Sequence, residues 1–105
     1  MAERREERAN QALRDSVAEF LVREAGPQSL ITVTRAEVSS NFLHATLYLT
    51  VLPEEKEAAA LALARRSIPE LKKFIEERVR LPRMPHIDFY IDRGQKNADR
   101  LEELS

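Results

Sequence analysis

The sequence predicts an α+β fold in which a three-stranded sheet carries its helices on one face. Three observations predict it: apolar residues recur at helical spacing in the long blocks, they alternate with polar residues in the short ones, and the blocks run helix, strand, strand, helix, helix, strand. A chain of 105 residues supports one core. We therefore expect a single domain over residues 1–92 and a short polar C-terminal tail over residues 93–105.

The first helix is expected over about residues 3–24. Its apolar side chains have the spacing i, i+4, i+7, i+8 of one helical face: Leu13, Val17, Phe20 and Leu21. Gly26 and Pro27 follow, and this pair is typical of a helix end. The helix should therefore bury one face against the sheet.

Three strands are expected. Residues 30–38 alternate until Arg35 and Ala36, where the phase slips and a β-bulge is predicted. After a turn at residues 39–41, residues 43–51 place one set of side chains on the core face: Leu43, Ala45, Leu47, Leu49 and Val51. These two strands form an antiparallel hairpin. The third strand, residues 86–92, is reached by a helical crossover.

The crossover contains a helix that is interrupted once. It opens at Leu52-Pro53, runs to Arg66, resumes after the sequence Ser67-Ile68-Pro69, and stops at Leu81-Pro82. Ser67, with Glu70 three residues later, fits a capping box, and the proline then falls in a first turn where its missing N–H is not needed. We therefore expect two helices that meet at a bend.

Charge is distributed unevenly along the chain, whose formal net charge is −1. Residues 64–86 carry seven basic and three acidic side chains, a local charge of +4. A phosphate-binding face has this signature, with the helix N-terminus at the bend adding free N–H groups. The solvated face of an ordinary helix, with i,i+4 ion pairs, has it too. Both interpretations stay open on charge alone.

The sequence offers little for catalysis or for a cofactor. There is no cysteine, the two histidines His44 and His86 lack a third ligand, and two glycines cannot form a glycine-rich phosphate loop. Asp88 and Asp92 on one strand face would lie about 13 Å apart. We therefore expect a protein that is not an enzyme, with no cofactor and no metal site.

Nothing in the sequence indicates a membrane protein. No apolar run approaches the roughly 18 residues of a membrane span, and the N-terminal stretch MAERREERAN lacks the apolar segment of a signal peptide. We expect a cytoplasmic protein, a monomer, with no membrane partner.

Two blocks of the chain resemble the ribosome-binding factor A family, whose fold is of the KH type II kind: ITVTRAEVSSNFLHATLYLTVL (31–52) and RLPRMPHIDFYID (80–92). The features that carry the likeness in combination are Val33-Thr34 before Glu37-Val38-Ser39, then Ala45 and Tyr48, then Pro85, Phe89, Tyr90 and Asp92. The order α-β-β-α(bent)-α-β agrees with that fold.

The resemblance implies a ribosome-binding factor for maturation of the bacterial small ribosomal subunit. Its partners would be that subunit and its rRNA, with other assembly factors as further candidates. The residues expected to bind RNA are Arg65, Arg66, Ser67, Lys72, Lys73, Arg80 and Arg83, around a helix bend made by Ser67, Ile68 and Pro69.

This chain departs from the family pattern at the bend. Relatives have alanine, any residue, glycine where Ser67, Ile68 and Pro69 stand here, and usually arginine where Pro82 stands. Proline still breaks the helix but makes a rigid turn. We expect Arg80 and Arg83 to take over the missing arginine's role.

The alternative function is that of a protein-interaction module, which docks through its sheet face or N-terminal helix without RNA.

Overall fold

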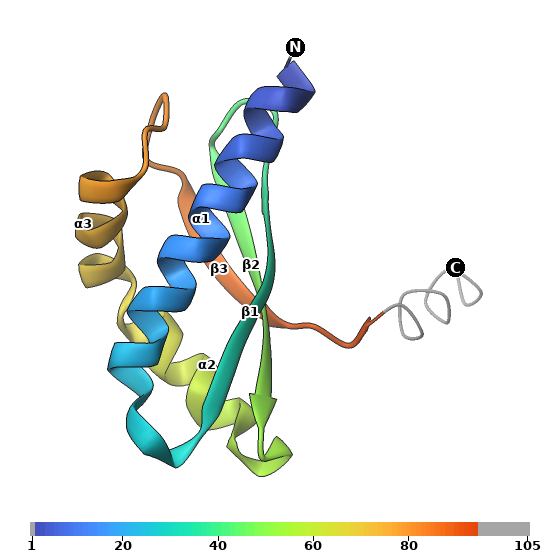
Figure 1. The fold of residues 1–105 in the computed structure, drawn as a ribbon, viewed down its shortest axis with the longest axis vertical. Coiled ribbons are helices and arrows are strands. Elements are labelled where there is room, and N and C mark those ends of the chain that lie inside the picture. The colour runs from blue at the N-terminus through green and yellow to red at the C-terminus, as the bar shows by residue number, and fades with distance from the viewer. Residues whose placement is uncertain (1, 95–105) are drawn as a thin grey trace.

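The computed structural model describes residues 2–94, and their elements follow the predicted order (Figure 1). They are α1 (Ala2–Ala25), β1 (Leu30–Val38), β2 (His44–Leu52), α2 (Glu57–Arg66), α3 (Ile68–Arg78) and β3 (His86–Ile91). Short 3₁₀ turns at Gly26–Gln28 and Glu54–Lys56 follow α1 and precede α2. Most of the predicted tail, from residue 95 onward, lies outside the described residues.

The sheet has the order β1-β2-β3. β1 pairs antiparallel with β2, and β2 pairs parallel with β3, as a hairpin followed by a helical crossover requires. α1 packs on β1 and on α3, while α2 packs on β3 and β2 (Figure 1). The predicted α+β architecture is confirmed.

The core lies between α1 and the inner face of the sheet. All four apolar side chains predicted to face the core from the first helix are buried: Leu13, Val17, Phe20 and Leu21. Phe74 is one of the core residues that were not predicted. Phe74 of α3 is buried and meets Phe20 edge to face, with 5.5 Å between the ring centroids, so it joins α3 to α1.

The predicted β-bulge is present in β1. Val33 pairs with Leu49 and Arg35 with Tyr48, so Thr34 is the extra residue. Beyond it Ala36 turns to the core, and the polar side of the strand faces outward. The bulge thus explains the slip in the alternation.

The prediction that Leu43 belongs to the core face is wrong. β2 begins at His44, Leu43 is 43% exposed, and the buried residue is Phe42, which is 7% exposed. Phe42 has a left-handed backbone, with φ of +58°, and this turns its side chain inward. The Asn41 side chain accepts a hydrogen bond from the Leu43 amide (3.1 Å) and helps to hold the turn.

In the described part of the chain, no helix has the length and apolar character needed to cross a membrane.

Candidate nucleic-acid interface

The predicted bend is present. α2 ends at Arg66, α3 begins at Ile68, and Ser67 alone separates them, with φ −89° and ψ 1°. Pro69 lies in the first turn of α3, where its missing N–H costs no hydrogen bond. Figure 1 shows the two helices meeting at an angle rather than continuing one another.

The predicted capping box is wrong. The Ser67 hydroxyl donates backward to the Leu63 carbonyl oxygen (2.8 Å) and makes no cap bond to α3. The reason is local: an N-cap residue has an extended backbone, whereas Ser67 lies near the bridge region, and from there its side chain returns to the preceding turn. Ser67 is also buried, so its side chain is not available to RNA.

The absence of a cap has a consequence for anion binding. Leu71 donates its amide to the Ser67 carbonyl oxygen (2.8 Å), which closes the first turn of α3. Within residues 2–94, the amides of Ile68 and Glu70 have no acceptor. These two N–H groups are therefore available at the positive end of the α3 dipole.

The four predicted cations nearest the bend are not equivalent. The Arg65 guanidinium lies against β3, 3.3 Å from Asp88 Oδ1 and 2.7 Å from the Phe89 carbonyl oxygen. Lys72 is half-buried. Arg66 and Lys73 are exposed and form no ion pair with any described residue. Of the four, Arg66 and Lys73 are thus the cations open to a phosphate, Arg66 beside the bend and Lys73 halfway along α3.

Arg80 and Arg83 lie beyond the other end of α3. With 11 residues in that helix, the two ends are roughly 16 Å apart at 1.5 Å per residue. Both arginines line a surface hollow of about 300 Å³ together with Glu76 and Met84. The predicted cations therefore spread along α3: Arg65 and Arg66 before its start, Lys72 and Lys73 near its middle, and Arg80 and Arg83 beyond its end.

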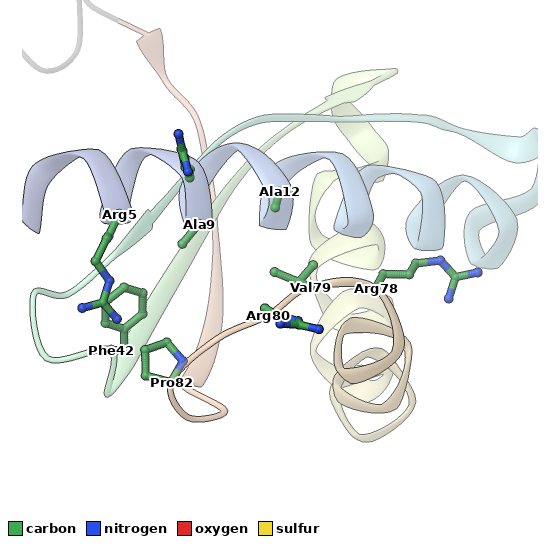
Figure 2. A pocket seen from close by; sticks show the side chains of 9 residues that line it. Arg5, Ala9, Ala12, Phe42, Arg78, Val79, Arg80 and Pro82 are labelled. Carbon is green, nitrogen blue, oxygen red and sulfur yellow. The ribbon is translucent and has the colours of Figure 1, made fainter. Parts of the chain in front are cut away.

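A third basic feature was not predicted as a site. A groove of about 310 Å³ lies between α1 and the segment that follows α3 (Figure 2). It is lined by four arginines and five apolar residues: Arg5, Arg8, Arg78, Arg80, Ala9, Ala12, Phe42, Val79 and Pro82. We call it the arginine groove. The available signal was the i, i+3, i+7 spacing of Arg5, Arg8 and Ala12, which places them along one stripe of the helix.

The outer face of the sheet carries an aromatic row. Arg35, Tyr48 and Tyr90 are register partners across the three strands; the Arg35 guanidinium lies 4.1 Å from the Tyr48 ring centroid, and the two tyrosine centroids are 6.4 Å apart. Burial is the main cause that raises the pKa of Tyr48, and the nearby Glu37 carboxylate raises it further. Acidic side chains thus share this face with the aromatic rings, which suits a phosphate backbone poorly.

The two histidines are neighbours on that face. His44 pairs with His86, and their rings meet edge to face with centroids 6.1 Å apart. Among the described residues, no group of three histidine, cysteine, aspartate or glutamate side chains is arranged to hold a metal ion.

The two aspartates of the third strand region have separate partners. Asp88 pairs with Arg65, as described above. Asp92 accepts hydrogen bonds from the Thr34 hydroxyl and, at 2.8 Å, from the Gly94 amide, and these two bonds lower the pKa of the Asp92 carboxyl. The bond to Thr34 joins the end of β3 to the bulge in β1.

Comparison with known proteins identifies the family. The family model described as ribosome-binding factor A matches residues 5–105. The chain belongs to the ribosome-binding factor A family. A relative of that name from Gemmatimonas aurantiaca is 28% identical over 105 residues, which covers 96% of this chain and 72% of the relative. The predicted family is confirmed.

Solved structures agree. The crystal structure of ribosome-binding factor A from Thermus thermophilus matches with a TM-score of 0.76 at 24% identity, covering 85% of this chain and 98% of that one. A homology model of the Thermus thermophilus ribosome-binding factor A, fitted into a cryo-EM map of its 30S complex, matches with a TM-score of 0.67 at 26% identity, covering 79% of this chain and 90% of that one. The family fold is therefore present over most of the chain.

Proposed function

We propose that this protein is an assembly factor that binds the rRNA of the maturing bacterial small ribosomal subunit through its helix bend. Membership of the family supports the ribosome as its target, and the Thermus relative has been fitted into a 30S complex. The observation that carries the proposal is the bend itself, where Arg66 directly precedes a helix N-terminus with open amides and Lys73 follows halfway along the same helix; neither cation forms an ion pair with a described residue. In this proposal the protein acts in the cytoplasm, as a monomer, without catalysing a reaction.

The bend binds a phosphate by a combination of charge and directed donors. The amides of Ile68 and Glu70 point along the α3 axis, where the dipole favours an anion. Arg66 and Lys73 add charge-assisted hydrogen bonds from the ends of flexible side chains. Because such contacts read the backbone of RNA, specificity arises from RNA shape and single-stranded segments.

Arg65 has a supporting role in this scheme. Arg65 bonds to the Phe89 carbonyl oxygen and to Asp88, so it fixes the end of α2 on β3 and thereby the orientation of the bend. At the far end of α3, Arg80 and Arg83 provide further phosphate contacts. An RNA strand that runs along α3 would then engage cations before, along and beyond the helix.

Substitution of the two free cations tests this proposal. The variant Arg66→Gln with Lys73→Gln should bind small subunits more weakly, and the slope of log affinity against log salt should become shallower by about 1.4, or 0.7 for each lost contact to single-stranded RNA. Arg14→Gln with Lys56→Gln is the matched control, since it removes one arginine and one lysine elsewhere. Equal binding by both variants, each with its native circular dichroism spectrum, would place the RNA site away from the bend.

A second candidate function rests on the outer sheet face. The row of Arg35, Tyr48 and Tyr90 exposes aromatic surface beside the carboxylates of Glu37 and Asp92, a mixture that suits a protein partner. Other assembly factors are candidate partners of this face. A complex with such a protein that forms without RNA and is unaffected by salt would favour this function.

A further inference from the structure

We propose that the arginine groove is a second phosphate-binding site, which takes the backbone of a single-stranded RNA segment independently of the bend. The inference rests on the proposed function, because it adds a second contact to the same RNA-binding role. It depends on three features of the groove: cations from distant parts of the chain line it together, one of them contacts an aromatic ring, and its lining contains no acidic side chain.

The cations come from two segments that the fold brings together. Arg5 and Arg8 lie about one turn apart on α1, and Arg80 lies in the segment between α3 and β3. Figure 2 shows Arg5 at one end of the groove and Arg80 near its middle, with Ala9 and Ala12 on the side of α1 that faces them. The small alanine side chains leave room for a ligand beside the helix.

Arg5 lies beside an aromatic ring. Its guanidinium carbon lies 5.9 Å from the centroid of the Phe42 ring, within the range of a cation–π contact (Figure 2). Phe42 is itself buried and fixed in its left-handed turn. When a guanidinium stacks on a ring, the N–H donors at its edge remain free. These N–H groups form paired hydrogen bonds with a phosphate.

The charge of the groove is not compensated by its own lining. Arg78 is occupied elsewhere, because it lies 3.6 Å from Glu19 and 3.6 Å from the Phe74 ring centroid. Arg5, Arg8 and Arg80 form no ion pair with any residue between positions 5 and 94. Like charges gathered around one hollow repel one another, so an anion bound there would stabilise the fold.

The surroundings favour a chain of phosphates over a single nucleotide. Arg80 lines both the arginine groove and the neighbouring hollow that contains Arg83, so the basic surface continues past the groove. The floor of the groove is apolar, formed by Ala9, Ala12 and Val79, and suits the sugar edge of a strand while the arginines hold its phosphates. Exposed guanidinium groups along a path are typical of a groove that follows a nucleic-acid backbone.

The test uses the full-length protein and a short oligouridylate, with affinity measured by fluorescence anisotropy across a salt series. The variant Arg5→Gln with Arg8→Gln should bind more weakly, and its slope of log affinity against log salt should be shallower by about 1.4. The control, Arg14→Gln with Arg23→Gln, removes the same charge from the same helix at side chains already paired with Asp15 and Glu19, and should keep the native slope.

Three outcomes would overturn the groove as an RNA site: no binding of oligouridylate by the native protein, an unchanged slope in the groove variant, or an equal loss in the control. A second variant, Arg80→Gln, provides an independent test in case the first variant misfolds. Its slope of log affinity against log salt should be shallower than that of the native protein by about 0.7. Small subunits provide the separate test of the proposed function. If the native protein binds oligouridylate through the groove but does not bind subunits, the proposed assembly role is wrong, whereas the proposal of an RNA site in the groove is supported.

Discussion

Replacing Thr34 by valine should destabilise the protein by about 1 to 2 kcal/mol at pH 7. The Thr34 hydroxyl donates to the Asp92 carboxylate across β2, so it joins the bulge of β1 to the end of β3. A hydrogen bond to an ionised group contributes about 1.5 to 3 kcal/mol, and the half-exposed position of both partners lowers this figure. Valine keeps the shape and the β-branch of threonine, so the change removes this bond together with the longer contact from the same hydroxyl to the Tyr48 carbonyl oxygen (3.3 Å).

The effect should depend on pH in a defined direction. The hydrogen bonds from Thr34 and Gly94 lower the pKa of Asp92 in the folded protein. A group whose folded pKa is depressed contributes stability that is complete above its unfolded pKa, about 3.9 for aspartate, and is lost as the pH falls through the folded value. The difference in stability between native protein and variant should therefore be full at pH 7 and shrink below about pH 4.

Urea denaturation followed by circular dichroism, at neutral and at acidic pH, measures both effects. The matched control is Thr32→Val, the same substitution on the same strand at an exposed position, where no side-chain hydrogen bond is present among the described residues. If Thr34→Val cost no more than this control, or if its cost were the same at both pH values, the hydrogen bond to Asp92 would not be the cause.

Two further predictions concern the helices. Phe74→Ala should destabilise the protein by roughly 3 to 4 kcal/mol in urea denaturation, since Phe74 is buried against Phe20 and joins α3 to α1; a loss below about 1 kcal/mol would show that this contact is weak. Ser67→Ala should cost less than about 0.5 kcal/mol, because the hydroxyl bonds to Leu63 and does not cap α3. Thermal unfolding measures this cost, and a loss of about 1 kcal/mol, the value for a true N-cap, would contradict the prediction.

Most of the fold follows from local patterns. The burial of Leu13 and Val17 on α1 follows from helical spacing, and the position of the bulge follows from the change of phase in β1. The interruption at Ser67 and Pro69 was also predictable, since proline near a serine restarts a helix. Each of these features depends on a few neighbouring residues, which is why the sequence predicts them.

The errors arise where a backbone angle decides the outcome. Alternation predicted Leu43 in the core, but the left-handed turn at Phe42 reverses the two positions. A capping motif predicted a forward bond from Ser67, but its bridge-region backbone directs the hydroxyl back to Leu63. Neither angle is specified by the residue type, because serine and phenylalanine adopt these regions only where the surrounding structure fixes them.

The candidate site shows the limit of charge counting. The excess of basic residues over positions 64–86 is real, but α3 separates Arg66 from Arg80 by its full length. Arg5 and Arg8 lie far from Arg80 along the chain, yet they share a groove with it. Which cations face one another is a property of the packing of α1 against the segment after α3, and no local pattern contains it.

The most direct test of the central claim is cosedimentation of the native protein with purified small ribosomal subunits, immature and mature, across a salt series. The proposal predicts binding that prefers the immature particle and weakens steeply as salt increases, because phosphate contacts hold the complex. Failure to bind either particle at low salt would contradict an assembly role and would leave docking of a protein partner on the outer sheet face as the better account.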